Sequence, residues 1–247
     1  MRLTRIHVPG PLTAGSDIVL PEQAGEHLAR VLRLPPGAPF TLFNGAGGEF
    51  SAALKESPGK RICAHVLVHT PVERESPLQI TLLQGVARGE RMDLIVQKAT
   101  ELGVTRIIPV LAERSVVKLD AKQRARKREH WQAIAISACE QCGRNRVPEV
   151  AEPTPLGDSL AALDEGGLRC LLAADGPESL VSAASRAAMR PIALLIGPEG
   201  GLAENERAFA QANRFVACRL GPRIMRTETA GLAALAALQA VSGDLSK

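Results

Sequence analysis

The sequence predicts an α/β protein in which a small β-barrel precedes a larger domain built on a parallel sheet. Up to about residue 70 the chain shows short strand patterns separated by turn residues. From about residue 79 onward, apolar strands alternate with helical patterns, which is typical of a parallel sheet covered by helices on both faces. A polar, proline-flanked stretch at 70–77 separates the two patterns, so we expect domains at 1–72 and 73–247.

The first domain contains strand patterns and a single helical pattern. Apolar residues recur at helical spacing over 22–32, which predicts a helix there. The glycine-rich stretch 44–48 between two strand patterns predicts a hairpin turn. The strands of this barrel are expected at 3–8, 17–20, 39–43, 49–54 and 61–68.

The second domain follows a strand–helix rhythm. In parallel sheets of this kind, ligands bind beyond the carboxyl ends of the strands, so the loops at those ends are the candidate sites. Strands are expected at 79–85, 104–111, 168–174, 192–197 and 214–220, and helices at 91–102, 121–142, 178–187, 204–212 and 228–241.

Composition limits the possible partners. The 247 residues carry a formal net charge of +4, and the basic excess lies mainly in the middle of the chain, which is compatible with a polyanionic partner. Aromatic residues make up only 2%, so a surface that stacks successive bases is hard to build, and RNA contacts would depend on arginine, lysine and shape. No apolar run is long enough to span a bilayer and the start lacks a secretory core, so we expect no membrane partner and a cytoplasmic protein.

No metal site is expected from the cysteines and histidines. An odd number of cysteines, five, fits reduced thiols rather than a disulfide framework. Cys139 and Cys142 form a CxxC without a second pair at zinc-ligand spacing, and a structural role is the favoured interpretation. His65 and His69 lie in a strand pattern without the glutamate of a zinc helix, and we interpret them in the same way.

Two glycine- and proline-containing loops follow predicted strands, at 197–201 (Gly-Pro-Glu-Gly-Gly) and at 221–230. Glycines let a ligand touch the backbone, and prolines stiffen the path around it. Neither a G-x-G-x-x-G dinucleotide motif nor a P-loop occurs, so hydride transfer and nucleotide hydrolysis lose their usual support. Without further information, a plain tight turn is an equal alternative for 197–201.

These loops closely resemble the two C-terminal signatures of the ribosomal RNA small-subunit methyltransferase E family. The resemblance rests on 194–201 and 220–230, and it extends upstream over nearly the whole chain, at 27–33, 97–104, 113–115 and 140–144. It implies a PUA-like barrel followed by a SPOUT domain whose C-terminal elements form a trefoil knot. Knots are rare exceptions to the usual rules of chain connection, and the sequence alone does not indicate one.

The activity implied by this resemblance is methylation of uridine N3 in 16S ribosomal RNA, with S-adenosylmethionine as cofactor and without metal. It also implies a homodimer whose subunits complete each other's active site, and we expect an assembled small-subunit particle as substrate. The implied cofactor-binding residues are Leu195, Ile196, Gly197, Pro198, Glu199, Gly200, Gly201, Leu220, Gly221, Ile224, Met225, Arg226, Thr229 and Ala230.

The uracil N3–H is weakly acidic, so the site needs a base or a cation that stabilises the uracil anion. Arg226 and Arg114 are the candidate cations, and Glu101 or Glu140 the candidate base. A structural ion pair is the alternative interpretation of each glutamate. The candidate RNA-binding residues are Arg5, Arg30, Arg33, Lys98 and Arg144.

Alternatives stay open at this point. The basic run 118–128 is either a solvated helix face or a surface that follows RNA phosphates. A SPOUT enzyme that methylates a ribose 2'-hydroxyl would share the cofactor loops, although the strings 140–144 and 223–230 argue against it. A non-catalytic ribosome-assembly factor would not need the loop 197–201, and a cofactor titration separates that alternative.

Overall fold

The computed structural model describes residues 4–55, 61–186 and 190–245, and these residues form two compact units. Unit 1 contains the described residues up to Glu75 together with Cys139–Val147. Unit 2 contains Ser76–Ala138 and the described residues from Pro148 onward. A segment from the middle of the chain is therefore part of the N-terminal unit.

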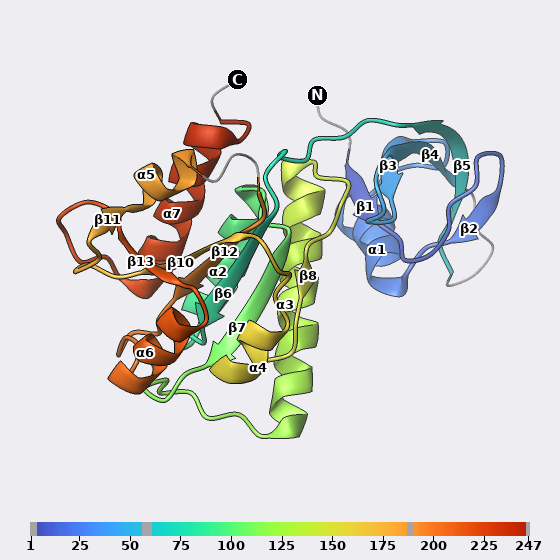
Figure 1. Ribbon diagram of the computed structural model, residues 1–247. Coiled ribbons are helices and arrows are strands. Elements are labelled where there is room, and N and C mark those ends of the chain that lie inside the picture. Colours follow the sequence, from blue (N-terminus) through green and yellow to red (C-terminus); the bar gives the residue numbers. More distant parts are fainter. Residues whose placement is uncertain (1–3, 56–60, 187–189, 246–247) are drawn as a thin grey trace. The chain divides into compact units, whose positions relative to one another are not determined.

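Unit 1 is built on a five-stranded sheet that curves around an apolar core (Figure 1). Burial alternates along the central strand, so one face of the sheet packs on the core, which includes Leu28, Phe40 and Val66. The predicted strands are confirmed, except that the predicted start at Leu3 lies outside the described residues. In the order β1-β3-β4-β5-β2, the strands are β1 (Arg5–His7), β2 (Asp17–Val19), β3 (Pro39–Phe43), β4 (Glu49–Lys55) and β5 (Cys63–Thr70).

The predicted helix over 22–32 is confirmed, but its second half is wider than an α-helix. Helix α1 (Glu22–Glu26) continues as a π-helical turn, η1 (His27–Val31). The Leu32 N–H donates to the His27 carbonyl at 2.9 Å, which is the π-helical spacing. Arg33 then adopts a left-handed conformation with φ 51°, so the turn ends on an exposed arginine where a glycine is usual.

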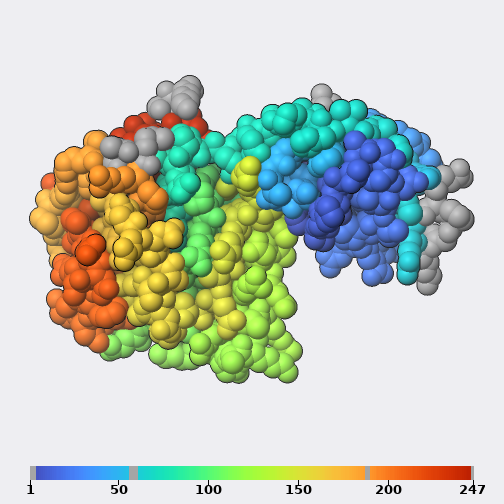
Figure 2. Space-filling view, turned by 45° about the vertical axis from the view of Figure 1, so that its right-hand side comes forward, coloured from blue at the N-terminus to red at the C-terminus, as the bar shows by residue number. Residues whose placement is uncertain are grey.

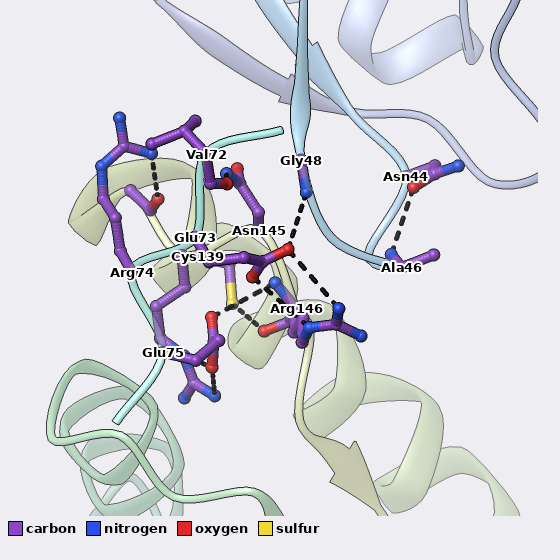
Figure 3. A network of polar contacts seen from close by, with 12 residues as sticks. Asn44, Ala46, Gly48, Val72, Glu73, Arg74, Glu75, Cys139, Asn145 and Arg146 are labelled. Atoms are coloured by element: carbon purple, nitrogen blue, oxygen red, sulfur yellow. Dashed lines mark hydrogen bonds and ion pairs between the residues drawn. The ribbon is translucent and has the colours of Figure 1, made fainter. Parts of the chain in front are cut away.

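A polar network joins segment Cys139–Val147 to the rest of unit 1 (Figure 3). The Asn145 side-chain amide donates to the Val72 carbonyl at 2.7 Å. The buried Arg144 donates to Glu75 Oε2 at 2.6 Å, and the buried Arg5 pairs with Glu49 and donates to Asn145 Oδ1 at 2.5 Å. These bonds pair the terminal nitrogens of guanidinium groups that would otherwise be costly to bury.

Unit 2 contains an eight-stranded parallel sheet with the order β11-β13-β10-β12-β6-β7-β8, and β9 also pairs with β7. The central strand β12 is fully buried, as expected for a strand covered on both faces. The strands are β6 (Ile80–Gly85), β7 (Arg106–Leu111), β8 (Glu149–Val150), β9 (Thr154–Pro155), β10 (Leu168–Leu172), β11 (Glu178–Ser179), β12 (Ile192–Ile196) and β13 (Val216–Arg219).

Helices cover both faces of this sheet, as predicted. On one face, α4 and α6 enclose a core with Leu83, Leu171 and Leu195, and the two helices lie side by side on the surface (Figure 2). On the other face, α7 packs on β6 and β12, and α2 and α5 pack on α7. The helices are α2 (Arg91–Glu101), α3 (Ala121–Cys142), α4 (Leu156–Ala161), α5 (Leu180–Ser185), α6 (Glu204–Ala212) and α7 (Thr227–Ser242).

The longer strands and helices of unit 2 confirm the predicted elements, whereas four short ones were not predicted. The missed elements are β8, β9, β11 and α4, which are two to six residues long. So few residues do not establish a period that can be recognised in a sequence. The helix predicted at 178–187 corresponds to α5, and its predicted end at Ala187 lies outside the described residues. None of the helices in the described ranges is long and apolar enough to cross a membrane.

Candidate functional site

A cavity of about 650 Å³ opens in unit 2 at the carboxyl ends of β10, β12 and β13. Because these strands are parallel neighbours, their carboxyl ends meet at one edge of the sheet, which is where α/β proteins bind ligands. The segments that line the cavity are the ends of β10 and β12, the loop after β12, and the chain from Leu220 into the first turn of α7. The volume lies within the range of small-molecule sites, about 300–1,000 Å³.

The loop 197–201 has little room for side chains. A Cβ atom added to Gly197 would lie 3.0 Å from the Leu202 nitrogen, and one added to Gly200 would lie 3.1 Å from Arg114 Cβ. Gly201 has φ 70°, which favours glycine, and its N–H donates to the Pro198 carbonyl at 2.8 Å. The loop is therefore a defined tight turn whose backbone lies along the cavity wall.

The end of strand β6 packs directly against this turn. A Cβ atom added to Gly85, the last residue of β6, would lie 2.4 Å from the Pro198 nitrogen. Real atoms do not approach so closely, so any larger residue at Gly85 would displace the loop.

Two buried polar side chains link the two loops. Thr227 Oγ1 donates to the Gly197 carbonyl at 2.6 Å. The Gln84 side-chain amide in turn donates to Thr227 Oγ1 at 2.9 Å. Both side chains are buried, so the bonds are shielded from water and fix the start of α7 against the end of β12.

The second loop presents apolar surface to the cavity. The Ile224 residue is 88% exposed, and Met225 and Leu220 are half-buried beside it. Ile224 therefore offers apolar surface to a ligand in the cavity.

Charged side chains also line the cavity. Arg91, from the start of α2, pairs with Glu199 at 2.9 Å and lies 3.7 Å from Glu228. Partial burial alone would raise the pKa of the Glu199 carboxyl, but hydrogen bonds from the Arg88 N–H and from Arg91 hold it below its ordinary value. The cavity lining contains further arginines, at Arg114, Arg207, Arg223 and Arg226.

Most of the predicted cofactor residues lie on the cavity. Those among its lining residues are Ile196, Gly197, Pro198, Glu199, Gly201, Leu220, Ile224, Met225, Arg226 and Ala230. The side chain of Leu195 packs in the core beneath α4 and α6 instead. Gly200, Gly221 and Thr229 lie in the same loops or the start of α7, but outside the lining itself.

The four predicted catalytic residues divide into two groups. Arg114 and Arg226 line the cavity and are exposed. Glu101 is the last residue of α2 and pairs with Lys98 at 2.9 Å. Since Arg91 at the opposite end of α2 borders the cavity, Glu101 lies about 15 Å further along that helix. This separation argues against Glu101 as a base within the same chain's cavity.

Glu140 belongs to unit 1, whereas the cavity lies in unit 2. Its Oε1 accepts a hydrogen bond from the His7 N–H at 2.9 Å. Burial raises the pKa of the Glu140 carboxyl, although the bond from His7 works in the opposite direction. The structure thus gives Glu140 a role inside the barrel unit.

The predicted RNA-binding arginines are also divided. Arg5 and Arg144 are 7% and 5% exposed and are held by Glu49 and Glu75, which is at odds with direct RNA contact. The sequence did not show this, because the acidic partners lie 44 and 69 residues away. Arg30, which pairs with Glu26, and Arg33 are exposed on the surface of unit 1.

Three residues that shape the cavity were not predicted from the sequence. Gln84 and Thr227 link the loops, and Glu228 contributes a carboxylate to the lining. The local signals were a glutamine after two leucines near the end of the strand 80–85, and a threonine and a glutamate at a helix start.

Comparison with known proteins shows to which family the chain belongs. Residues 74–239 match the RNA methyltransferase domain family, and residues 20–67 match the RNA methyltransferase PUA domain family. The chain is 36% identical to ribosomal RNA small subunit methyltransferase E of Bacillus subtilis over 86% of this chain and 85% of that protein. It belongs to the ribosomal RNA small subunit methyltransferase E family.

Solved structures agree with this membership. A methyltransferase E from Neisseria gonorrhoeae, solved with S-adenosylmethionine, is 38% identical, with a TM-score of 0.90 over 98% of this chain and 99% of that one. A methyltransferase from Legionella pneumophila, also with bound S-adenosylmethionine, is 38% identical, with a TM-score of 0.93 over 99% of this chain and all of that one. The fold of a methyltransferase E therefore extends over the whole chain, and the predicted PUA-like and SPOUT parts are confirmed. The trefoil knot stays a prediction.

Proposed function

We propose that this methyltransferase E family member methylates N3 of a uridine in 16S ribosomal RNA, with S-adenosylmethionine as the methyl donor. The observation that carries the proposal is the cavity at the strand ends, which is lined by the two loops that resemble the family signatures. The related structures from Neisseria gonorrhoeae and Legionella pneumophila contain S-adenosylmethionine. The chain covers almost all of both structures, so the cofactor site has its counterpart within this sequence.

The described residues fit this cofactor. The three glycines of the turn Gly197–Gly201 let a ligand approach its backbone, and Ile196, Leu202 and Ile224 offer apolar surface to a nucleoside. S-adenosylmethionine carries positive charge on its sulfonium and amino groups, which the Asp175 and Glu199 carboxylates in the lining complement. In this proposal the loop after β12, Leu220–Arg226, and the first turn of α7 with Thr229 and Ala230 hold the cofactor.

When bound, the cofactor supplies an electrophilic methyl group on its sulfonium. The chain's residues must orient the uracil and favour loss of its N3 proton. Arg114 and Arg226 are exposed cations in the lining, and we assign to them the stabilisation of negative charge on the uracil ring.

The proposal includes how the RNA is held. With 2% aromatic residues, affinity depends on spaced cations that recognise a preformed RNA shape, so the substrate is an assembled small-subunit particle. Arg30 and Arg33 in unit 1 and Lys98 in unit 2 are exposed or half-buried and are the retained RNA-contact residues. The reaction then takes place in the cytoplasm.

A homodimer completes the proposal. Helix α7 leaves Leu232 half-buried and Val241 38% exposed, and Leu94 on the neighbouring helix α2 is 43% exposed. A second copy that covers these side chains would bury apolar surface symmetrically. Light scattering at micromolar concentration should report twice the mass of the chain, and a fully active monomer would contradict the dimer.

The test of the function is nucleoside mass spectrometry of small subunits from a strain lacking this protein, before and after incubation with it and S-adenosylmethionine. N3-methyluridine should appear in the 16S RNA. Methyl label on a ribose or on cytidine would contradict the uridine assignment. Equal activity on deproteinised RNA would contradict only the assembled substrate.

A further inference from the structure

We propose that Glu228 is the proton acceptor of the methyl-transfer reaction, taking the N3 proton from the target uracil. This inference rests on the proposed function and adds a catalytic residue to it. It replaces Glu101 and Glu140, which the sequence suggested and which do not line the cavity.

Glu228 lies in the wall of the cavity, in the first turn of α7. Its side chain is 14% exposed, and its two oxygens have different surroundings. Oε1 lies 3.7 Å from Arg91 Nε. Oε2 is buried and has no hydrogen-bond partner among the residues that the structure describes. A buried carboxylate oxygen without a partner is costly in a folded protein, and such a group calls for a donor that arrives with a ligand.

The other carboxylates of the cavity lining are already engaged. Glu199 Oε1 accepts from the Arg88 N–H and from Arg91, both at 2.9 Å. Asp175 is exposed and accepts two hydrogen bonds from Arg207, at 2.9 Å each. Among the described lining residues, Glu228 is therefore the carboxylate with a buried oxygen still available to a substrate proton.

A cation and a helix start lie beside the Glu228 carboxylate. Arg91 Nε lies 3.7 Å from Oε1. The positive end of the α7 helix dipole also favours an anion in the first turn of that helix. Arg91 is itself fixed by Glu199, so the carboxylate is supported by a second ion pair. Oε2, which has no partner among the described residues, is in this proposal the oxygen that accepts the substrate proton.

The proposed step transfers the N3 proton to Glu228 and the methyl group to N3. As the proton of uracil N3 passes to Glu228 Oε2, the nitrogen electron pair forms the bond to the methyl carbon. The electron pair of the broken carbon–sulfur bond stays on sulfur. The products are N3-methyluridine, S-adenosylhomocysteine and a protonated carboxyl group, which then returns its proton to water. General-base assistance of this kind contributes about 100- to 10,000-fold to a rate.

The experiment compares wild type with Glu228→Gln, which keeps the shape of the side chain and removes the base. Single-turnover methylation of small subunits at saturating S-adenosylmethionine and pH 7 should fall at least about 100-fold. Cofactor affinity measured by calorimetry should stay within about threefold, because the missing base acts on the uracil. Glu204→Gln, an exposed carboxylate at the start of α6, is the matched control and should retain the wild-type rate.

A pH series gives a second readout. Arg91 from α2 lies 3.7 Å from Glu228, and the cavity lining also contains the charged residues Glu199, from the loop after β12, and Arg226, the residue before α7. In Glu228→Gln the rate should keep rising between pH 7 and 9, since the uracil itself must lose its proton to solvent. Wild type should be nearly flat over this range. If Glu228→Gln folds poorly, Glu228→Asp should show a reduced rate with the flat profile of wild type.

Three outcomes distinguish a failure of the Glu228 inference from a failure of the proposed function. A wild-type rate in Glu228→Gln would overturn the inference and leave the proposed function intact. Loss of cofactor affinity with a normal rate at saturation would also overturn it, since Glu228 would then bind the cofactor. A wild-type protein that forms no N3-methyluridine would instead overturn the proposed function.

Discussion

Thr227 Oγ1 lies 2.6 Å from the carbonyl oxygen of Gly197, and this hydrogen bond joins the two loops of the cavity. The Gln84 amide donates to the same hydroxyl from the end of β6. Three segments that lie far apart in the sequence thus meet at one threonine. The bond explains how a loop of glycine and proline keeps a fixed shape beside a ligand site.

Thr227→Val should test this link, because valine has the same shape and lacks the hydroxyl. The change removes the donor to the Gly197 carbonyl and one of two acceptors of the buried Gln84 amide, whose other acceptor is the Gly85 carbonyl at 3.1 Å. This should cost about 1–3 kcal/mol in the free energy of unfolding. S-adenosylmethionine should bind about tenfold more weakly, as measured by calorimetry. Thr81→Val, at the opposite end of β6 from the cavity, is the control. Unchanged affinity in Thr227→Val would show that the bond does not position the loop.

Gly85→Ala should displace the turn 197–201. The added Cβ would lie 2.4 Å from the Pro198 nitrogen, so either the loop or the strand must shift, at a cost of about 1–3 kcal/mol. We expect a lower midpoint in chemical denaturation and weaker cofactor binding. Gly157→Ala, where the nearest atoms beyond α4 are 3.9 Å away, should be neutral or slightly stabilising. Similar behaviour of the two variants would contradict the close packing at Gly85.

Arg144→Ala should affect the stability of unit 1. The arginine is 5% exposed and pairs with Glu75 at 2.6 Å, so its removal leaves a largely buried carboxylate without its cation. The free energy of unfolding should fall by about 3 kcal/mol, measured by denaturation with urea. The control is Arg186→Ala, which removes an exposed ion pair with Glu178 and should leave stability unchanged. A fully stable Arg144→Ala that binds RNA poorly would restore this residue as an RNA contact.

Glu140 should make the stability of unit 1 depend on pH. Burial raises the pKa of its carboxyl in the folded state, so the folded protein binds a proton more readily than the unfolded chain. As pH rises from the ordinary glutamate pKa through the raised value, this residue therefore lowers stability. Glu140→Gln should be more stable than wild type at pH 7, and the difference should shrink towards pH 4. Glu129→Gln, an exposed position on the same helix, should show no such trend in thermal unfolding.

The longer elements, and the two loops that line the cavity, could be predicted from the sequence alone. Strand and helix periods are local properties, so the alternation from residue 79 onward and the turns at 197–201 and 221–226 could be recognised without knowing what lies beside them. The family strings then indicated which strand ends form the site, and the cavity lies at those ends.

Tertiary structure decided which charged and polar side chains serve the site. Gln84 and Thr227 are 143 residues apart, and no local pattern indicates that they share a hydrogen bond. In the same way, Arg144 has its acidic partner 69 residues away, which turned a predicted RNA contact into a buried ion pair. Glu101 and Glu228 look alike in the sequence, but only Glu228 borders the cavity. Burial and partner distance depend on how distant segments pack, and a local pattern does not contain that information.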